Sequence, residues 1–84
     1  MPGTLKVSVI SPEATLFEGE ASSVVAPAFD GEVGILPSHA PMVTTLGSGI
    51  LRIDNGEARF QVEGGFVQVV DNVVRVVTEK ATKI

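Results

Sequence analysis

The most constrained stretch of the chain is Asp30-Gly31-Glu32-Val33-Gly34-Ile35-Leu36-Pro37-Ser38-His39-Ala40-Pro41-Met42. It contains two glycines, two prolines, two acids and the only histidine of the sequence. Glycine allows backbone angles that a Cβ forbids, and proline fixes φ and donates no backbone hydrogen bond. The stretch therefore predicts a corner at which the chain passes between sheets, with a positive φ at Gly34. We expect the corner to present four side chains on loops at one end of the domain: Asp30, Glu32, Ser38 and His39.

The composition predicts one all-β domain. A chain of 84 residues is long enough for a single hydrophobic core. Val, Ile and Thr contribute 25 residues against five Leu, and β-branched side chains favour strands over helices. The absence of Cys excludes disulfides and thiolate metal sites, so the fold must rest on aliphatic burial. This composition fits a reducing, cytoplasmic setting.

The charge pattern argues against nucleic acid as a partner. The formal net charge is −4 and the six Lys and Arg are scattered, whereas phosphate binding needs clustered bases. The first residues lack the apolar core of a signal peptide, and no uncharged apolar run approaches the roughly 18 residues that span a bilayer. We therefore expect a soluble domain without direct membrane insertion, which leaves attachment to a membrane complex through another subunit open.

Short apolar segments on both sides of the corner predict the strands. Residues 5–9 alternate strictly, and residues 14–19 and 42–46 are further short candidates. Residues 22–29 are nearly continuous in apolar side chains, but Pro27 removes a ladder donor and indicates an edge position or a bulge. Together with two hairpins, this predicts about eight to ten strands and no helix, the pattern of an antiparallel β-sandwich or flattened barrel. The polar residues after the last strand, 79–84, are expected to form a frayed tail.

Asn55-Gly56 is the strongest hairpin signal, because a type I′ turn needs positive φ at both central residues. The turn sets a register in which Arg52 lies opposite Arg59, with opposite charges on the diagonals, as is typical of a solvated face. Alternate residues of the two strands should then enter the core: Leu51, Ile53, Ala58, Phe60 and Val62.

A second hairpin is predicted at Asp71-Asn72. It places on one face Val67, Val69, Val74 and Val76. The opposite face is too apolar for a surface wholly in water, because it combines Gln68 and Arg75 with Phe66, Val70, Val73 and Val77. Either a second sheet of the domain or a partner protein should cover it, and the second sheet is the favoured cover.

The sequence offers little for catalysis. A nucleophilic triad could recruit Ser38, His39 and Asp30, but adjacent side chains diverge in extended structure and nothing supplies an oxyanion hole. One His with irregularly spaced carboxylates does not predict a zinc site, and the glycines match no phosphate-binding fingerprint. We therefore expect no catalytic residue, metal or cofactor, and expect His39 to cap a turn or meet a partner.

Residues 31–42 resemble the signature of the epsilon subunit of rotary F-type ATP synthases, which is called delta in mitochondria. Residues 5–13, 16–19, 46–50 and 62–70 are also similar in sequence to this family, so the resemblance extends over the whole chain. It implies a single sandwich domain of ten strands over residues 1–84. Most bacterial members continue into a carboxy-terminal helical hairpin that restrains ATP hydrolysis and in some of them binds ATP. That hairpin is expected to be absent here, so neither property is carried over.

The resemblance also implies a function in the central stalk. The family's sandwich binds the gamma subunit and rests on the ring of c subunits, so that proton flow is coupled to ATP synthesis. It performs no bond chemistry, contacts the alpha/beta catalytic head only indirectly, and is peripheral to the cytoplasmic face of the bacterial inner membrane. By position, the c-ring contact is expected at Asp30, Gly31 and Glu32. The gamma contact is expected at or near His39, Met42, Thr44, Gly65 and Phe66.

Two interpretations from other classes stay open at this point. One is an unrelated ligand-binding sandwich, for which four Phe without Trp or Tyr provide few stacking surfaces. The other is a small metal-dependent jelly-roll enzyme, for which a single His provides too few ligands. Binding to gamma separates the first from the stalk interpretation, and metal analysis tests the second.

Overall fold

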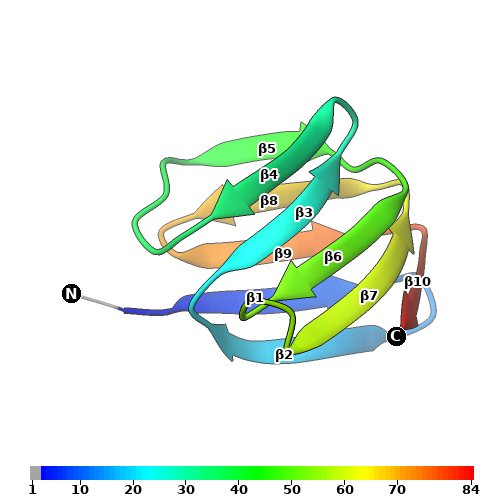
Figure 1. Cartoon of the computed structure of the whole chain (residues 1–84), viewed down its shortest axis with the longest axis horizontal. Coiled ribbons are helices and arrows are strands. Elements are labelled where there is room, and N and C mark those ends of the chain that lie inside the picture. The colour runs from blue at the N-terminus through cyan, green and yellow to red at the C-terminus, as the bar shows by residue number, and fades with distance from the viewer. Residues whose placement is uncertain (1–2) are drawn as a thin grey trace.

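A computed structural model describes residues 3–84. Two five-stranded sheets pack face to face (Figure 1), and the described residues contain no helix. Sheet A has the order β2-β1-β9-β8-β5, and sheet B has the order β10-β7-β6-β3-β4. This confirms the predicted all-β sandwich. The strands are β1 Leu5–Ile10, β2 Thr15–Ala21, β3 Val24–Ala28, β4 Gly31–Ile35, β5 Met42–Thr45, β6 Gly49–Ile53, β7 Ala58–Glu63, β8 Phe66–Val70, β9 Val73–Val77 and β10 Lys80–Lys83.

The strand pairs are antiparallel except at the centre of sheet A, where β1 and β9 run parallel. The edge strands β4 and β5 belong to different sheets, and residues 36–41 connect them. The predicted corner between sheets is therefore confirmed.

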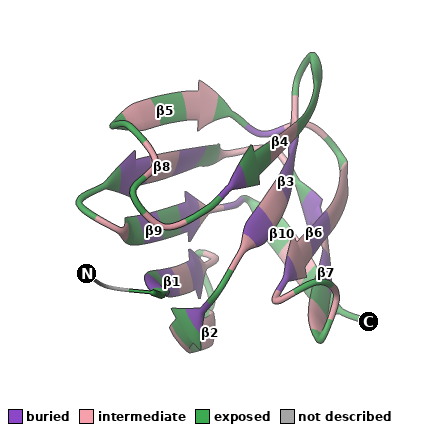
Figure 2. Cartoon of the chain, turned by 60° about the vertical axis from the view of Figure 1, so that its left-hand side comes forward, coloured by how far each residue is buried: buried purple, intermediate pink, exposed green. Residues whose placement is uncertain are grey.

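Both inner faces are built from alternating apolar residues, which meet in one core between the sheets (Figure 2). The rings of Phe17 and Phe60 pack edge to face, with centroids 6.4 Å apart. The inner faces predicted for the strands are confirmed, with Ala58 half-buried and the others fully buried: Leu5, Val7, Val9, Leu51, Ile53, Phe60, Val62, Val67, Val69, Val74 and Val76.

Both predicted hairpin turns are confirmed. Asn55 and Gly56 have φ of 58° and 94°, and the Glu57 N–H donates to the Asp54 carbonyl at 3.2 Å. Arg52 lies opposite Arg59 as predicted. In the second turn, Asp71 and Asn72 have φ of 49° and 64°. Consecutive positive φ values are the geometry that a type I′ turn requires.

The predicted positive φ at Gly34 is wrong. Gly34 lies inside strand β4, its φ is not positive, and an added Cβ would meet nothing within 4 Å. The positive φ values near the corner belong to Gly31, at 133°, and Ser38, at 71°. The chain therefore turns before and after β4, and the strand between the turns is extended.

Pro27 does not mark an edge strand, because β3 lies between β6 and β4. The β3–β6 ladder covers only Val24 and Val25, so it has ended before the proline that lacks an N–H. The Pro27 carbonyl accepts a hydrogen bond from the Gly47 N–H at 2.8 Å. A proline is tolerated in an interior strand here because the ladder stops early.

The expectation of a frayed tail is wrong for Lys80–Lys83, which form β10 and pair with β7. Buried Thr78 fixes the crossing from β9 into this strand. Its Oγ1 lies 3.2 Å from the Glu63 carbonyl oxygen and 2.9 Å from the Lys80 carbonyl oxygen.

Candidate interaction surfaces

The outer face of sheet A carries exposed apolar side chains on both sides of the Gln68–Arg75 pair. Phe66, Val70 and Val73 expose 41%, 42% and 40% of their surface, and Val43 exposes 66%. In the β8–β9 ladder Phe66 lies opposite Val77, and Val70 lies opposite Val73. Sheet B packs against the other side of these strands, so the expectation that it covers this face is wrong. We call the five residues Val43, Phe66, Val70, Val73 and Val77 the apolar face.

One end of the apolar face is hollowed beside Phe66. The hollow has a volume of 420 Å³ and is lined mainly by apolar side chains, among them Ile10, Pro12, Phe66 and Val77. Gly65 also lines it, with a φ of 99°, and an added Cβ would lie 1.9 Å from the Val77 carbonyl oxygen. Glycine is therefore required where β8 begins beside the end of β9.

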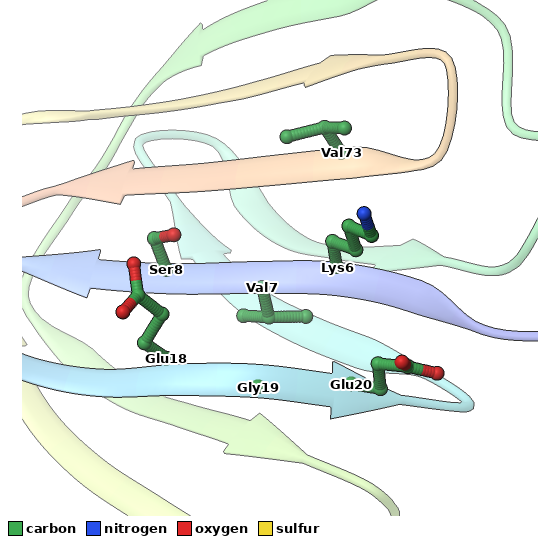
Figure 3. Close-up of a pocket in the computed structure, with 7 residues that line it drawn as sticks. All are labelled: Lys6, Val7, Ser8, Glu18, Gly19, Glu20 and Val73. Carbon is green, nitrogen blue, oxygen red and sulfur yellow. The ribbon is translucent and has the colours of Figure 1, made fainter.

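Charged side chains border the apolar face on β1 and β2. Lys6 lies opposite Glu20 and Ser8 lies opposite Glu18 in the ladder, and they line an open groove of 340 Å³ that reaches Val73 (Figure 3). The lining offers an ammonium group, a hydroxyl and two carboxylates on a sheet surface. It does not have the arrangement of a nucleophile with an oriented base.

The turn between β3 and β4 presents a second surface. Phe29 at this turn exposes 71% of its surface, and Asp30 beside it is also exposed. The Phe29 N–H donates to the Thr45 carbonyl at 3.1 Å, and the Leu46 N–H donates to the Gly65 carbonyl at 2.9 Å. These bonds fix the turn beside the start of β8. We call residues 29–32 the β3–β4 tip.

Glu32 of the tip forms an ion pair with Arg52 of β6, with Oε1 3.0 Å from Nη2. The side chains of Arg52 and Glu32 are 38% and 53% exposed. The pair reaches across β3, where Val25 lies opposite Arg52 on one side and Gly34 on the other. It is the only salt bridge recorded among residues 3–84.

The residues expected at the c ring lie together, because Asp30, Gly31 and Glu32 all belong to the β3–β4 tip. The residues expected at gamma are spread along the sandwich. Met42 and Thr44 are half-buried and lie opposite inward-facing valines of β8. Half-buried His39 lies in the connection 36–41, where its Nδ1 is 2.7 Å from the Ala40 carbonyl oxygen. Gly65 and Phe66 are near the tip, and only Phe66 belongs to the apolar face.

The corner residues do not share one end of the domain, so that expectation is wrong. The Ser38 N–H donates to Asn72 Oδ1 at 2.6 Å, which holds the connection beside the β8–β9 turn. The turn that carries Asp30 lies at the opposite end of the strands, at the upper right of Figure 1. Ser38, His39 and Asp30 are therefore not assembled into a triad. Within residues 3–84, no group of three or more acidic or histidine side chains is placed to hold a metal ion.

Asp54 organises the sheet B end near the β6–β7 turn. The backbone N–H and the hydroxyl of Ser22 donate to Asp54 Oδ1 at 2.6 and 2.7 Å. These two hydrogen bonds hold the pKa of Asp54 below its usual value. The carboxylate thus connects the β2–β3 crossing to the β6–β7 turn and has a structural role.

Sequence reasoning missed Phe29 as a surface residue. It ends the apolar run 22–29, and such a run predicts burial for each of its large side chains. The signal that could have found it is its place next to Asp30-Gly31, because a side chain at a hairpin tip has no facing strand to pack on.

Comparisons with known proteins agree with this architecture. Residues 4–84 match the model of the "ATP synthase, Delta/Epsilon chain, beta-sandwich domain". The ATP synthase epsilon chain of Leptospira interrogans is 53% identical over 77 residues, covering 89% of this chain and 61% of its own length. That of Rhodopirellula baltica is 42% identical over 83 residues, covering 96% of this chain and 65% of its own. This chain thus spans less than two thirds of the length of these relatives.

Solved structures share the fold. A cryo-EM structure of Euglena gracilis mitochondrial ATP synthase, OSCP/F1/c-ring, contains a chain with a TM-score of 0.89 and 24% identity, covering 99% of this chain and 55% of that one. The central stalk/c-ring structure from Tetrahymena thermophila mitochondrial ATP synthase gives a TM-score of 0.78 and 19% identity, covering 93% and 65%. In residues 3–84 no helix is long and apolar enough to cross a membrane. From the family match and the bacterial relatives, the chain belongs to the family of ATP synthase delta/epsilon-chain β-sandwich domains.

Proposed function

We propose that this chain is a non-catalytic central-stalk component of a proton-translocating F-type ATP synthase, which binds gamma and docks it on the c ring. The observation that carries the proposal is the pair of separate surfaces on one sandwich, the apolar face and the β3–β4 tip. A protein that joins two partners needs two such surfaces. The match to ATP synthase epsilon chains supports the choice of gamma and the c ring as partners, which the family resemblance implies.

Gamma binds through the apolar face. Exposed apolar side chains that lie on both sides of the Gln68–Arg75 pair favour a protein partner, and the hollow beside Phe66 has room for an apolar side chain of that partner. Phe66 makes the direct contact and Gly65 shapes the hollow. Met42 and Thr44 support the β5 edge of this surface, and His39 extends it at the other end.

The c ring binds at the β3–β4 tip, through Asp30, Gly31, Glu32 and the neighbouring Phe29. An exposed aromatic ring beside carboxylates suits a partner loop that presents both apolar and basic groups. Both structural neighbours come from assemblies that include the c ring, which supports a place beside it. An exposed ion pair contributes only about 0 to 1 kcal/mol, so the apolar contact with gamma supplies most of the affinity.

In this role the domain transmits torque between the ring and gamma and changes no covalent bond itself. Proton flow turns the ring, and the domain keeps gamma attached to it, so that rotation reaches the alpha/beta catalytic head through gamma. The domain is then a peripheral subunit at the cytoplasmic face of the bacterial inner membrane.

Two exposed phenylalanines provide a matched test of the two surfaces. Phe66→Ser should weaken gamma binding by about 2 kcal/mol, because an aromatic anchor leaves its site. Phe29→Ser should leave gamma affinity unchanged and lower retention of the c ring and proton-coupled ATP synthesis. Phe29 is 71% exposed, so its replacement should barely change the thermal midpoint. Phe66 is 41% exposed, so its replacement should lower the midpoint slightly and gamma affinity is compared per folded molecule.

The measurements are titration of gamma with each variant, and ring association and ATP synthesis in reconstituted complexes. Unchanged gamma affinity in Phe66→Ser would remove the apolar face from the proposal. Full ring retention and coupling in Phe29→Ser, together with normal coupling in Phe66→Ser, would contradict the stalk function itself.

A further inference from the structure

We propose that Arg52 limits the negative charge that the β3–β4 tip offers to a basic partner. Arg52 neutralises Glu32, so that Asp30 supplies the uncompensated charge for docking. This inference rests on the proposed contact between the tip and the c ring. It concerns how the charge of that contact is set, and it adds Arg52, to which the resemblance assigned no role.

The geometry couples Arg52 to the tip although the two lie on different strands. Arg52 extends from β6 across β3, and Nη2 reaches Glu32 Oε1 of β4 at 3.0 Å. The residue of β4 in the same cross-strand row is Gly34, which has no side chain to obstruct the guanidinium. The half-buried Val25 lies between Arg52 and Gly34 in this row and supports the crossing.

The charges near Glu32 disfavour a second cation. Arg52 already neutralises the carboxylate, and Arg59 lies directly opposite Arg52 in the β6–β7 ladder. A basic group that approaches Glu32 must therefore displace Arg52 or accept repulsion from it. Asp30 is exposed at the turn and has no salt bridge within residues 3–84, so it meets the same basic group without competition.

The expected effects are modest because both members of the ion pair are partly exposed to water and salt. With Arg52 in place, Glu32 and Arg52 sum to zero charge and Asp30 contributes −1. Removing Arg52 raises the local charge to −2, and removing both members of the pair returns it to −1. The inference therefore predicts a gain of binding on loss of Arg52 alone.

The test uses complexes of gamma with this chain, titrated with purified c ring at low salt. Arg52→Gln should tighten ring binding about two- to five-fold, and Asp30→Asn should weaken it by a similar factor. The double variant Arg52→Gln with Glu32→Gln should bind like the original chain. Arg52→Lys keeps the positive charge and serves as the control for loss of the guanidinium alone, with binding near that of the original chain. At 1 M salt, where the screening length is about 3 Å, the differences should disappear.

A weaker or unchanged ring affinity for Arg52→Gln, with an unchanged thermal midpoint, would overturn the inference. A double variant that loses as much affinity as Asp30→Asn would also overturn the inference, because the Arg52–Glu32 pair would then itself attract the ring. In either case, the proposed ring contact would still hold if the original chain binds the ring and Phe29→Ser binds it more weakly. Absence of ring binding by the original chain would overturn both.

Discussion

The outer faces of the two sheets differ although their inner faces follow the same rule. On sheet A, β8 and β9 place Phe66 beside Val77 and Val70 beside Val73 on the outside. On sheet B, the outward positions of β6 and β7 place Arg52 beside Arg59, and Arg52 pairs with Glu32. A strand with one face in water should alternate apolar and polar residues. Strand β7 follows this pattern, whereas β8 and β9 also carry apolar residues on their outward face. The apolar outward residues of sheet A are the basis for the proposed gamma contact.

The β6–β7 and β8–β9 hairpins also have similar inner faces and different outer faces. Both have turns with consecutive positive φ, and both direct alternate apolar residues into one core. Their connections differ in length, with residues 54–57 between β6 and β7 and residues 71–72 between β8 and β9. Both hairpins bury one apolar face, so core packing does not determine the residues of the outward face. A substitution in one sheet should therefore leave the properties of the other sheet unchanged.

Gly65→Ala should break sheet A where β8 begins. The new Cβ would lie 1.9 Å from the Val77 carbonyl oxygen, so we expect a loss of about 4 kcal/mol or more in the free energy of unfolding. Gly64→Ala is the matched control, because its Cβ would meet mobile Glu79 side-chain atoms at 3.3 Å, and its positive φ of 69° should cost only about 1 kcal/mol. Urea unfolding of both variants measures the difference. Equal stabilities would show that the end of β9 is not where the structure places it.

Asn55→Ala combined with Gly56→Ala should weaken only the sheet B hairpin. Both residues have positive φ, and alanine disfavours this region, so a loss of about 2 kcal/mol is expected. Gamma affinity per folded molecule should stay unchanged because the turn belongs to sheet B, whereas the apolar face is the outer face of sheet A. A selective loss of gamma binding at normal stability would place an interface on this hairpin and remove the distinction between the sheets.

Gly31 and Gly34 should differ although both lie in β4 at the edge of sheet B. Gly31→Ala should cost about 1 kcal/mol because its φ is 133°. Gly34→Ala should be neutral or slightly stabilising, since the backbone is extended and the added Cβ meets nothing within 4 Å. The thermal midpoints of the two variants measure this difference. A larger drop for Gly34→Ala than for Gly31→Ala would indicate that φ at Gly34 is positive, as the sequence predicted.

Asp54 should give sheet B a small pH dependence. Its pKa is lowered in the folded state by the two Ser22 hydrogen bonds, so its contribution to stability is present above its unfolded pKa, near 4, and is lost as pH falls through the lower folded value. Asp54→Asn should therefore be less stable than the original chain at neutral pH, and the difference should shrink in acid. A difference that is constant down to pH 2 would show that the charge of Asp54 is not involved.

Local sequence patterns were sufficient for the inner faces and the hairpins. Strand alternation has a period of two, so Val67 and Val69 must share a face, and Asn55-Gly56 suits the positive φ values of its turn. Strand β10 was missed because an edge strand needs few apolar residues, and its only half-buried side chain is Ala81. Gly34 was misjudged because glycine is compatible with both extended and positive-φ backbone.

The surfaces were less predictable because they depend on which strands become neighbours. The Arg52–Glu32 pair exists because β3 alone separates β6 from β4, and the residues lie 20 positions apart in the chain. The same limit explains why Ser38 and Asp30 were expected together. Eight residues along a strand and a connection carry the chain from one end of the sandwich to the other, from the β3–β4 tip to the Ser38 contact with Asn72. The apolar outer face was visible in the sequence, but what covers it was not.

We propose that gamma binds the outer face of sheet A and makes no contact with Arg59 on the outer face of sheet B. The chain has no Cys, so single-cysteine variants can be labelled without background. The two variants are Val73→Cys on the apolar face and Arg59→Cys on the outer face of sheet B, both at exposed positions. The measurement is the rate of maleimide labelling of each variant with and without gamma. We expect gamma to slow the labelling of Val73→Cys steeply and to leave the labelling rate of Arg59→Cys unchanged. Slower labelling of Arg59→Cys, with an unchanged rate for Val73→Cys, would show that gamma binds sheet B and not sheet A.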